Sequence, residues 1–258
     1  MIPPFRLGSK VVVATHHKAG TFYCESVFAQ MCREFGWTFS CLQRRRQPDA
    51  WDIAFHADAT PERLAGVLGS GSKLLHVIRH PKSLIVSGVR YHLDAEEAWL
   101  DRPQGRFDGR SYRQALRSIE SLQGRIRFEM HHKGRETIAE MVAMESPALD
   151  VPRMTVKLED ISRDSTQHIY VAFLSFLGFR GAPLSQAVEI CVKQALWSMD
   201  SLPAHSRGGV DESWKAVFTP ELHAEFEELF GDAEAVLGYR RPPFPTAGSF
   251  GDGTPHLG

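Results

Sequence analysis

The stretch that most constrains the fold of this chain is residues 10–35, KVVVATHHKAGTFYCESVFAQMCREF. It opens with a short apolar run rich in β-branched residues, Val11 to Ala14, which is too brief for a helix and predicts a strand buried on both faces. A polar turn over residues 15–21 follows, and apolar residues then recur at helical spacing as far as Phe35. The stretch therefore predicts a strand, a tight turn and a helix, in that order.

The turn between this strand and this helix combines features that suit an anion. The first N–H groups of a helix have no partner within the helix, and the helix dipole places its positive end there. Lys18 adds a mobile positive charge, and Thr21 adds a hydroxyl donor next to Gly20. We interpret the turn as a candidate site for a cluster of anionic oxygens. The alternative is an ordinary strand-to-helix turn with a surface lysine.

This turn differs from the loop that binds nucleoside triphosphates. That loop reads G-x-x-x-x-G-K-[ST], with its lysine after the second glycine. Here Lys18 precedes Gly20, and no glycine opens the turn. The neighbouring His16 and His17 could suggest zinc, but adjacent side chains on an extended chain point apart and no set of further ligands is evident. We therefore predict no metal site.

Length and composition indicate an ordinary globular protein. The chain has 258 residues and a formal net charge of -1, which gives no reason to expect nucleic acid or an anionic membrane surface as a partner. No apolar run approaches the ~20 residues that span a bilayer, and the first residues lack the apolar core of a secretory signal. The four cysteines form no C-x-x-C pair. We expect a cytoplasmic protein with reduced thiols, and the sequence carries no indication of its oligomeric state.

Strands alternate with helices along the rest of the sequence. Further strands are predicted at 51–56, 73–78 and 154–158, and further helices at 60–69, 81–93, 164–177, 184–199 and 220–237. This alternation predicts an α/β fold with a mostly parallel central sheet, helices on both faces and a P-loop-like start. We expect a single domain over residues 1–240, with a helical or lid insertion around 94–148, and a Pro/Gly-rich tail at 241–258.

The expected insertion has two parts. Residues 94–110 are polar and punctuated by glycine, which is typical of a loop or lid. Residues 111–146 are mostly helical in pattern, with a break expected near Gly124 or Gly134.

Polar side chains also follow the next two predicted strands. Arg79 comes directly after the strand at 73–78, and Ser87 lies one and a half to two turns into the following helix. An arginine and a serine so placed can share a phosphate, although an arginine paired with an acidic neighbour is an equal alternative. His56 ends the strand at 51–56, at the same rim of the sheet. A histidine there can take up a proton at neutral pH, and a structural histidine is the alternative.

A glycine-rich segment near the carboxyl end carries one more arginine. Arg207 precedes Gly208 and Gly209, and Trp214 and Phe218 follow. An arginine on such a loop can lie over an anionic ligand, because glycine lets the backbone approach closely. A surface loop above a core tryptophan is the alternative, and by itself the better one.

The order of these motifs resembles the sulfotransferases that use 3′-phosphoadenosine-5′-phosphosulfate (PAPS). The matching stretches are HHKAGT, AFHAD, VIRHPKSLIVS, VKLEDIS and RGGVDESWKAVFT, and they span most of the chain in the family's order. Each stretch is a weak signal alone. Their joint order is specific, and so are the spacings from Arg79 to Ser87 and from Arg207 to Trp214.

The resemblance implies a role for each candidate residue. The first turn would cradle the 5′-phosphosulfate, and the arginine, serine and glycine-rich positions would hold the 3′-phosphate. The cofactor-binding positions would be Lys18, Ala19, Gly20, Thr21, Phe22, Tyr23, Arg79, Ser87, Arg207, Gly208 and Gly209. His56 matches the family's general base, and Lys18 would also be catalytic because it would stabilise charge on the leaving phosphate.

Several positions depart from the family's pattern. Phe22 stands where a second threonine is common, and Tyr23 stands in place of a tryptophan but is still able to stack on adenine. Leu158 replaces a tyrosine, Gly208 replaces a cation, and Ala54 replaces a lysine two residues before the expected base. The phosphate contacts are therefore better supported than the adenine contacts.

The resemblance implies transfer of a sulfuryl group from PAPS to a hydroxyl, or as second choice an amine, of a small molecule or carbohydrate. The second product would be adenosine-3′,5′-diphosphate (PAP), and no metal would be needed. Acceptor pockets in the family come from variable loops, here residues 36–50 and 90–125. Two alternatives remain open: a P-loop kinase or nucleotide hydrolase, and a non-catalytic nucleotide-binding protein that has kept the fold.

Overall fold

The computed structural model of the chain describes residues 5–43, 50–194 and 212–240. In this part of the chain five strands form one sheet: β1 (Val11–Ala14), β2 (Phe39–Cys41), β3 (Ile53–His56), β4 (Lys73–Ile78) and β5 (Arg153–Lys157). All neighbouring strands are parallel, in the order β2-β3-β1-β4-β5. The α/β fold with a parallel sheet is therefore confirmed. Strand β2 was not predicted from the sequence, because three residues are too few to show an alternating pattern.

Helices connect the strands and extend beyond the sheet. In the described residues they are α1 (Thr21–Phe35), α2 (Pro61–Leu64), α3 (Pro81–Asp94), η1 (Ala98–Asp101), η2 (Gly105–Phe107), α4 (Tyr112–Arg117), α5 (Leu122–His131), α6 (Lys133–Ala143), α7 (Leu158–Arg163), α8 (His168–Leu177), α9 (Gly181–Lys193), α10 (Trp214–Val217), α11 (Pro220–Phe230) and α12 (Ala233–Val236). The η elements are 3₁₀ helices.

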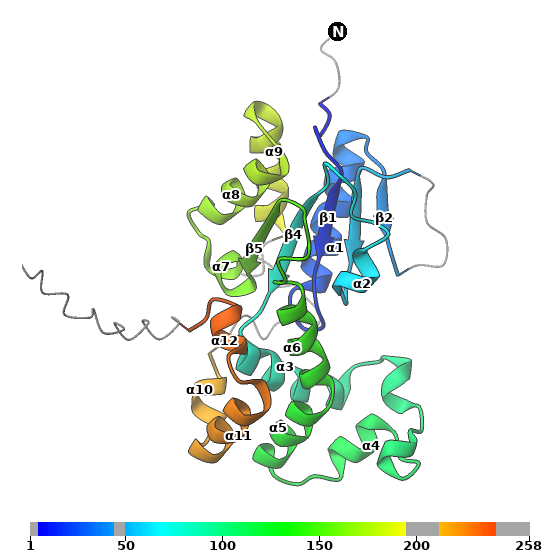
Figure 1. The fold of residues 1–258 in the computed structure, drawn as a ribbon, viewed down its shortest axis with the longest axis vertical. Helices are drawn as coiled ribbons and strands as arrows, with labels where there is room; N and C mark the ends of the chain where they lie inside the picture. Colours follow the sequence, from blue (N-terminus) through cyan, green and yellow to red (C-terminus); the bar gives the residue numbers. More distant parts are fainter. Residues whose placement is uncertain (1–4, 44–49, 195–211, 241–258) are drawn as a thin grey trace, which may run out of the picture.

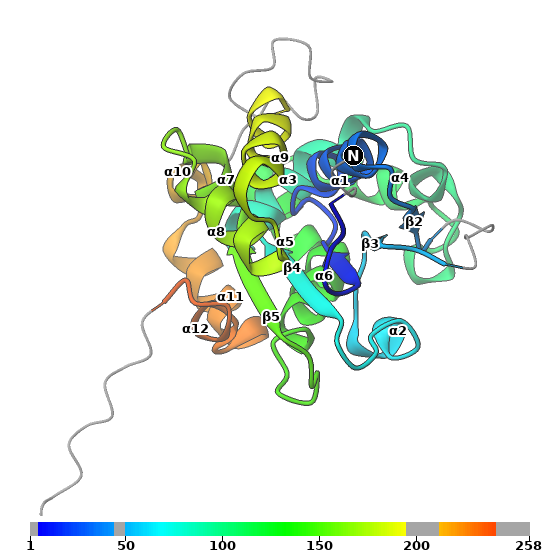
Figure 2. The ribbon, with the colours of Figure 1, turned by 90° about the horizontal axis from the view of Figure 1, so that it is seen from above.

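The two faces of the sheet bury different side chains because successive residues of a strand point in opposite directions. Val11 and Val13 of β1 pack in a large core with α1, α8 and α9. Val12 and Ala14 pack on the other face, in a smaller core that includes Leu64 of α2. Figure 2 shows α1 and α9 on one side of the sheet and α2 on the other. Strand β1 is therefore buried on both faces, as its apolar run predicts.

A second, helical part of the molecule lies beyond the carboxyl ends of the strands (Figure 1). Its core joins α3 and α5 to the C-terminal helices and includes Ile85, Ile126 and Leu222. Residues 94–117 add a small cluster around Tyr112, which is fully buried. Helices α5 and α6 of the insertion expected at 94–148 thus share a core with α3 and α11. None of the helices in the described ranges combines the length and the apolar character that a membrane span requires.

Several element boundaries differ from the sequence prediction. The strand expected at 154–158 ends at Lys157, and Leu158 begins α7. The helix expected from Asp164 begins at His168, because the Asp164 carboxylate accepts the N–H groups of the first helical turn and so caps it from outside. The helix expected over 220–237 is interrupted at Gly231, whose φ is 53°.

The helical stretch expected over 111–146 has two breaks, at residues 118–121 and at His132. The break at His132 lies two residues before Gly134, which confirms the break expected near Gly124 or Gly134. Ser121 supplies the reason for the first one, since its hydroxyl accepts the Gly124 N–H and starts α5.

The strand order defines where a ligand crevice can form. From β1 the chain leaves through α1 to the β2–β3 side, whereas β4 lies on the other side of β1 and leaves through α3. Such a reversal between neighbouring strands opens a crevice at their carboxyl ends in open α/β sheets. The turn at residues 15–20 follows β1, and Arg79 follows β4. The fold therefore places both predicted anion-binding segments at this switch point.

Candidate active site

The turn after β1 has an unusual backbone. Lys18 and Gly20 both adopt left-handed conformations, with φ of 61° and 84°. The His16 carbonyl accepts the Ala19 N–H at 2.9 Å and the Thr21 hydroxyl at 3.0 Å. A left-handed lysine stores strain, which persists only where the surroundings enforce it. The turn is therefore tightly closed, and the Thr21 hydroxyl serves that closure in this structure.

Gly20 allows α1 to begin directly against the neighbouring helix α7. A Cβ atom added to Gly20 would lie 2.7 Å from Cδ1 of Leu158. No side chain caps the helix at Gly20, so the first N–H groups of α1 stay available to an anion.

We expect Gly20→Ala to lower the free energy of unfolding by about 2–4 kcal/mol, the sum of the left-handed penalty and overpacking against Leu158. Urea denaturation measures this change. Gly66→Ala is the matched control, because a Cβ at Gly66 meets no atom within 4 Å. Equal stability losses in the two variants would contradict the argument.

Lys18 and Arg79 meet at the switch point. The Arg79 guanidinium donates from Nη1 to the Lys18 carbonyl at 3.0 Å, and Arg79 is only 6% exposed. The Lys18 ammonium lies 3.6 Å from the centre of the Tyr91 ring, a favourable cation–π contact. Burial, followed by the charge of Arg79, lowers the pKa of Lys18 to about 8, although Glu97 acts in the opposite direction. Two cations thus gather where an anion would relieve their repulsion.

Tyr91 connects this lysine to residues 94–101. Its hydroxyl donates to Glu97 Oε1 at 2.7 Å, and the Trp99 indole donates to Glu97 Oε2 at 2.5 Å. Burial and the bond to Glu97 raise the pKa of Tyr91 well above its usual value. The first residues of the predicted lid segment, including Glu97 and Trp99, therefore form a wall beside Lys18 through Tyr91.

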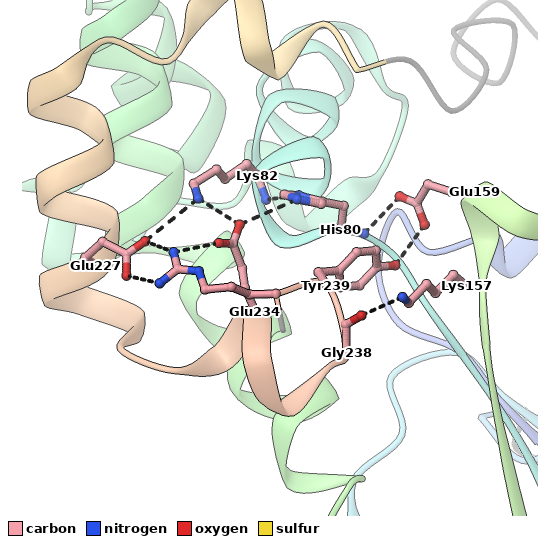
Figure 3. Close-up of polar contacts among 9 residues, drawn as sticks. His80, Lys82, Lys157, Glu159, Glu227, Glu234, Gly238 and Tyr239 are labelled. Atoms are coloured by element: carbon pink, nitrogen blue, oxygen red, sulfur yellow. Dashed lines mark hydrogen bonds and ion pairs between the residues drawn. The ribbon is translucent and has the colours of Figure 1, made fainter. Parts of the chain in front are cut away.

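The end of β4 that carries Arg79 is held by residues distant in sequence. Glu159, in the first turn of α7, accepts the His80 N–H at 2.9 Å and the Tyr239 hydroxyl at 2.8 Å. Figure 3 shows this carboxylate between the two donors. The VKLED stretch singled out in the sequence contains Glu159, whereas no sequence pattern pointed to Tyr239.

A buried ion pair fixes the same corner from the side of α3. Lys82 is 3% exposed and donates to Glu234 of α12 at 2.7 Å (Figure 3). The His80 ring stacks on Trp214, with 4.6 Å between ring centres. Burial lowers the pKa of His80 to about 4, so this ring is neutral at pH 7. Trp214 thus packs beside the strand end that carries Arg79.

Ser87 lies on α3 and is half-buried. Within the described residues its hydroxyl has no hydrogen-bonding partner. Its role at the 3′-phosphate stays a prediction.

His56 ends β3 in the same row as Ala14 of β1. Its carbonyl accepts the Thr15 N–H at 2.9 Å, which ties it to the start of the turn. Its Nδ1 accepts the Asp58 N–H at 3.3 Å, so the hydrogen of the neutral ring is on Nε2. Burial, followed by Arg63, lowers the pKa of His56 below its usual value, with Asp58 opposing. The ring is neutral at pH 7, as a general base requires.

The adenine contact expected of Tyr23 is corrected by the structure. Tyr23 is only 5% exposed and lies in the main core, so its ring has no free face for a nucleotide base. Its neighbour Phe22 is 58% exposed. One helical position decides the difference, because successive residues of α1 lie about 100° apart around the helix axis. The exposed ring at this end of α1 is that of Phe22.

The remaining predicted cofactor residues, Arg207, Gly208 and Gly209, lie outside the described residues. Ala19 is fully buried within the turn. In the described ranges there is no group of three or more His, Cys, Asp or Glu side chains arranged to hold a metal ion.

Comparisons with known proteins identify the fold. No protein-family model matches the sequence, and no curated protein matches it. Solved structures do match. Mouse sulfotransferase SULT7A1 complexed with PAP has a TM-score of 0.60 and 18% identity, over 89% of this chain and 86% of that one.

Two structures of retinol dehydratase also match. One is in complex with androsterone and the inactive cofactor PAP, with a TM-score of 0.55 and 13% identity over 94% of this chain and 84% of that one. The other holds retinol and PAP, with a TM-score of 0.56 and 11% identity over 93% and 84% of the two chains. The chain has the fold of the PAP-binding sulfotransferases.

Proposed function

We propose that this protein is a sulfotransferase that moves a sulfuryl group from PAPS to a hydroxyl group of a small molecule or carbohydrate, with an amine as the second choice. The observation that carries the proposal is the hydrogen bond from Arg79 to the Lys18 carbonyl, at 3.0 Å. It joins two cations from neighbouring strand ends beside an uncapped helix start. PAPS carries its anionic groups in two places, at the 5′ and 3′ positions, and therefore matches two adjoining cationic sites.

The residues of the site fit this nucleotide. The N–H groups that begin α1, together with Lys18, would hold the phosphosulfate. Arg79 and the hydroxyl of Ser87 would hold the 3′-phosphate, with Arg207, Gly208 and Gly209 as proposed further ligands. Phe22 offers the exposed ring for adenine. When bound, PAPS supplies an activated sulfuryl group on a phosphate leaving group.

His56 would remove the proton from the acceptor hydroxyl. In the structure its lone pair is on Nδ1 and accepts the Asp58 N–H. Proton transfer to Nε2 requires the other neutral tautomer, in which Nδ1 carries the hydrogen and the long Asp58 bond is given up. Alternatively, Nδ1 gives up the hydrogen bond from the Asp58 N–H and itself takes the proton of the acceptor hydroxyl. Either way the ring ends as an imidazolium.

Lys18 would balance the negative charge that develops on the leaving oxygen. Its ammonium acts together with the α1 dipole, and both are in place before the reaction. Tyr91 restricts the lysine side chain through the cation–π contact.

The acceptor class is supported by what the structural neighbours bind. Retinol dehydratase has been seen with androsterone and with retinol, and both compounds are apolar alcohols. In this chain the wall beside Lys18 contains Tyr91 and Trp99, whose rings suit either an apolar ring system or a sugar face.

The nucleotide site is tested by Arg79→Ala. We expect its affinity for PAP to fall by about 1.5–3 kcal/mol, the usual worth of a hydrogen bond to a charged group, because the 3′-phosphate loses its arginine. Isothermal titration calorimetry measures this change. Arg127→Ala is the control, since Arg127 is an exposed arginine of α5 that pairs with Glu225. PAP affinity unchanged in Arg79→Ala would remove the arginine from the site.

The reaction is tested by transfer of labelled sulfate from PAPS to a panel of alcohols, phenols, amines and sugars. Transfer to any hydroxyl acceptor supports the proposal. PAP binding without any transfer would indicate the non-catalytic alternative. Binding of ATP with Mg²⁺, and none of PAP, would indicate the kinase or hydrolase alternative.

A further inference from the structure

Two adjacent histidines of the turn are each bonded to a second histidine. His16 Nε2 lies 2.8 Å from His76 Nε2, and His17 Nε2 lies 2.9 Å from His92 Nε2. His16, His76 and His92 are fully buried, and His17 is half-buried. The two neighbouring side chains point apart, one to β4 and the other to α3. The turn that carries Lys18 is therefore held from two sides.

A half-buried carboxylate, that of Glu145, bonds to the first pair. Glu145 follows α6, and its Oε1 lies 2.7 Å from His76 Nδ1. The same oxygen accepts the Thr155 hydroxyl at 2.7 Å, and Arg153 lies 3.5 Å from the other oxygen. Burial alone would raise the pKa of Glu145, but the hydrogen bonds from His76 and Thr155 outweigh it and hold that pKa below its usual value. We call His16, His76 and Glu145 the β4 triad.

The second pair is built in the same way from different elements. Glu129 of α5 is 1% exposed, and its Oε2 lies 3.0 Å from His92 Nδ1. That oxygen also accepts the Tyr112 hydroxyl at 2.7 Å. Gly88 makes room for the carboxylate, because a Cβ there would lie 2.5 Å from Glu129 Oε1. We call His17, His92 and Glu129 the α3 triad.

Hydrogen bonding restricts each triad to one arrangement of protons. A carboxylate only accepts, so the middle histidine donates from Nδ1 and, when neutral, has its lone pair on Nε2. The turn histidine must then donate from its own Nε2. His16 and His17 are thus both restricted to the Nε2–H tautomer, and His16 Nδ1 is a buried atom without a partner in the described residues.

The surroundings of the triads oppose a second proton. Burial is the first cause that lowers the pKa of His16, of His17 and of His76. Other charged and titratable groups outside the triads also face these rings. They are His56, Arg63 and Lys133 for His16. They are Lys18 and Lys133 for His17, and Arg153 for His76. All of these groups disfavour added positive charge.

We propose that His76 and His92 are positioning residues, and that the two triads hold His16 and His17 in the turn conformation that presents Lys18 and the α1 N–H groups to the sulfated nucleotide. The His16 carbonyl accepts both the Ala19 N–H and the Thr21 hydroxyl, so rotation of this residue would open the turn. The binding part of this inference rests on the proposed function, whereas the tautomers and the turn conformation do not.

The first test compares PAP affinity in His76→Gln and His92→Gln with that of the unmodified protein. Glutamine keeps an acceptor near the position of Nε2 but cannot also bond to the glutamate behind it. We expect affinity to fall about 10-fold in each variant, as when an outer-shell partner of a binding residue is removed. Leu222→Ala in the helical core is the control for lost stability alone. Two folded variants that bind PAP like the unmodified protein would overturn the proposal.

The second test uses nitrogen NMR of the histidine rings and needs no nucleotide. We expect His16 and His17 each to show a single Nε2–H tautomer at neutral pH. In Glu145→Gln the signal of His16 should change to mixed tautomers and the Ala19 N–H should exchange faster, while His17 remains as before. Mixed tautomers in the unmodified protein would overturn the proposal. If the unmodified protein binds no PAP, the proposed function fails, and this test still decides whether the triads hold the turn.

Discussion

His56→Ala is expected to lower the turnover number for sulfuryl transfer by on the order of 10²–10⁴-fold, the usual contribution of a general base. The variant should still bind PAP, because His56 lies at the end of β3 and is not among the residues proposed to hold the nucleotide. Single-turnover kinetics with a saturating acceptor measure the change directly. A variant with unchanged turnover would exclude His56 as the base.

The pH profile separates a base from a structural role. Burial lowers the pKa of His56, so the free ring is already neutral at pH 7, and kcat/KM should rise with pH only in the acid range and then level off. This acid limb should disappear in His56→Ala. His168→Ala is the matched control, since His168 is an exposed histidine at the start of α8, and it should keep both turnover and the acid limb.

Lys18→Met is the second substitution with a large expected effect. We expect turnover to fall by on the order of 10²–10³-fold, as when one preorganised donor to a developing oxyanion is removed. PAP affinity should fall as well, because the variant loses a cation at the 5′-phosphate. Methionine keeps an unbranched apolar side chain of nearly the same length, so packing against the Tyr91 ring is largely kept, while the cation–π attraction is lost. Steady-state kinetics and calorimetry with PAP measure the two effects separately.

The same lysine predicts how nucleotide affinity depends on pH. Its pKa in the nucleotide-free protein is lowered to about 8 by burial and by Arg79, so the ammonium loses its proton as the pH rises through this value. PAP affinity should therefore decline between about pH 7 and 9. Lys18→Arg should abolish the decline, since a guanidinium stays charged throughout this range. A decline of equal size in Lys18→Arg would assign it to another group.

Much of the architecture could be predicted from local patterns. The apolar run at Val11 to Ala14 is a strand buried on both faces, and the turn and helix that follow are at the expected residues. His56 ends its strand and Arg79 follows its strand, as predicted from the sequence. The predicted helix boundaries were wrong where a side chain outside the periodic segment sets the boundary, as Asp164 does for the start of α8.

The partners within the site could not be predicted in the same way. Glu159 and Tyr239, which hold the end of β4, are 80 residues apart. His16 and His76 are 60 residues apart. In the sequence Tyr23 is as suitable for a ligand as Phe22, but in the structure the Tyr23 ring is buried in the core. Such contacts depend on how the strands and helices pack against one another, and this packing cannot be predicted from residue spacing in a single sequence.

The sequence by itself determined the strand, turn and helix at residues 10–35 and the residue types that can attract an anion, because hydrophobic periodicity and turn chemistry act over short distances. The tertiary structure alone decided that Arg79 reaches the Lys18 carbonyl and that His16 and His17 are held from opposite sides. The physical reason is that parallel strands bring distant segments together at one edge of a sheet, and only the strand order selects which segments meet.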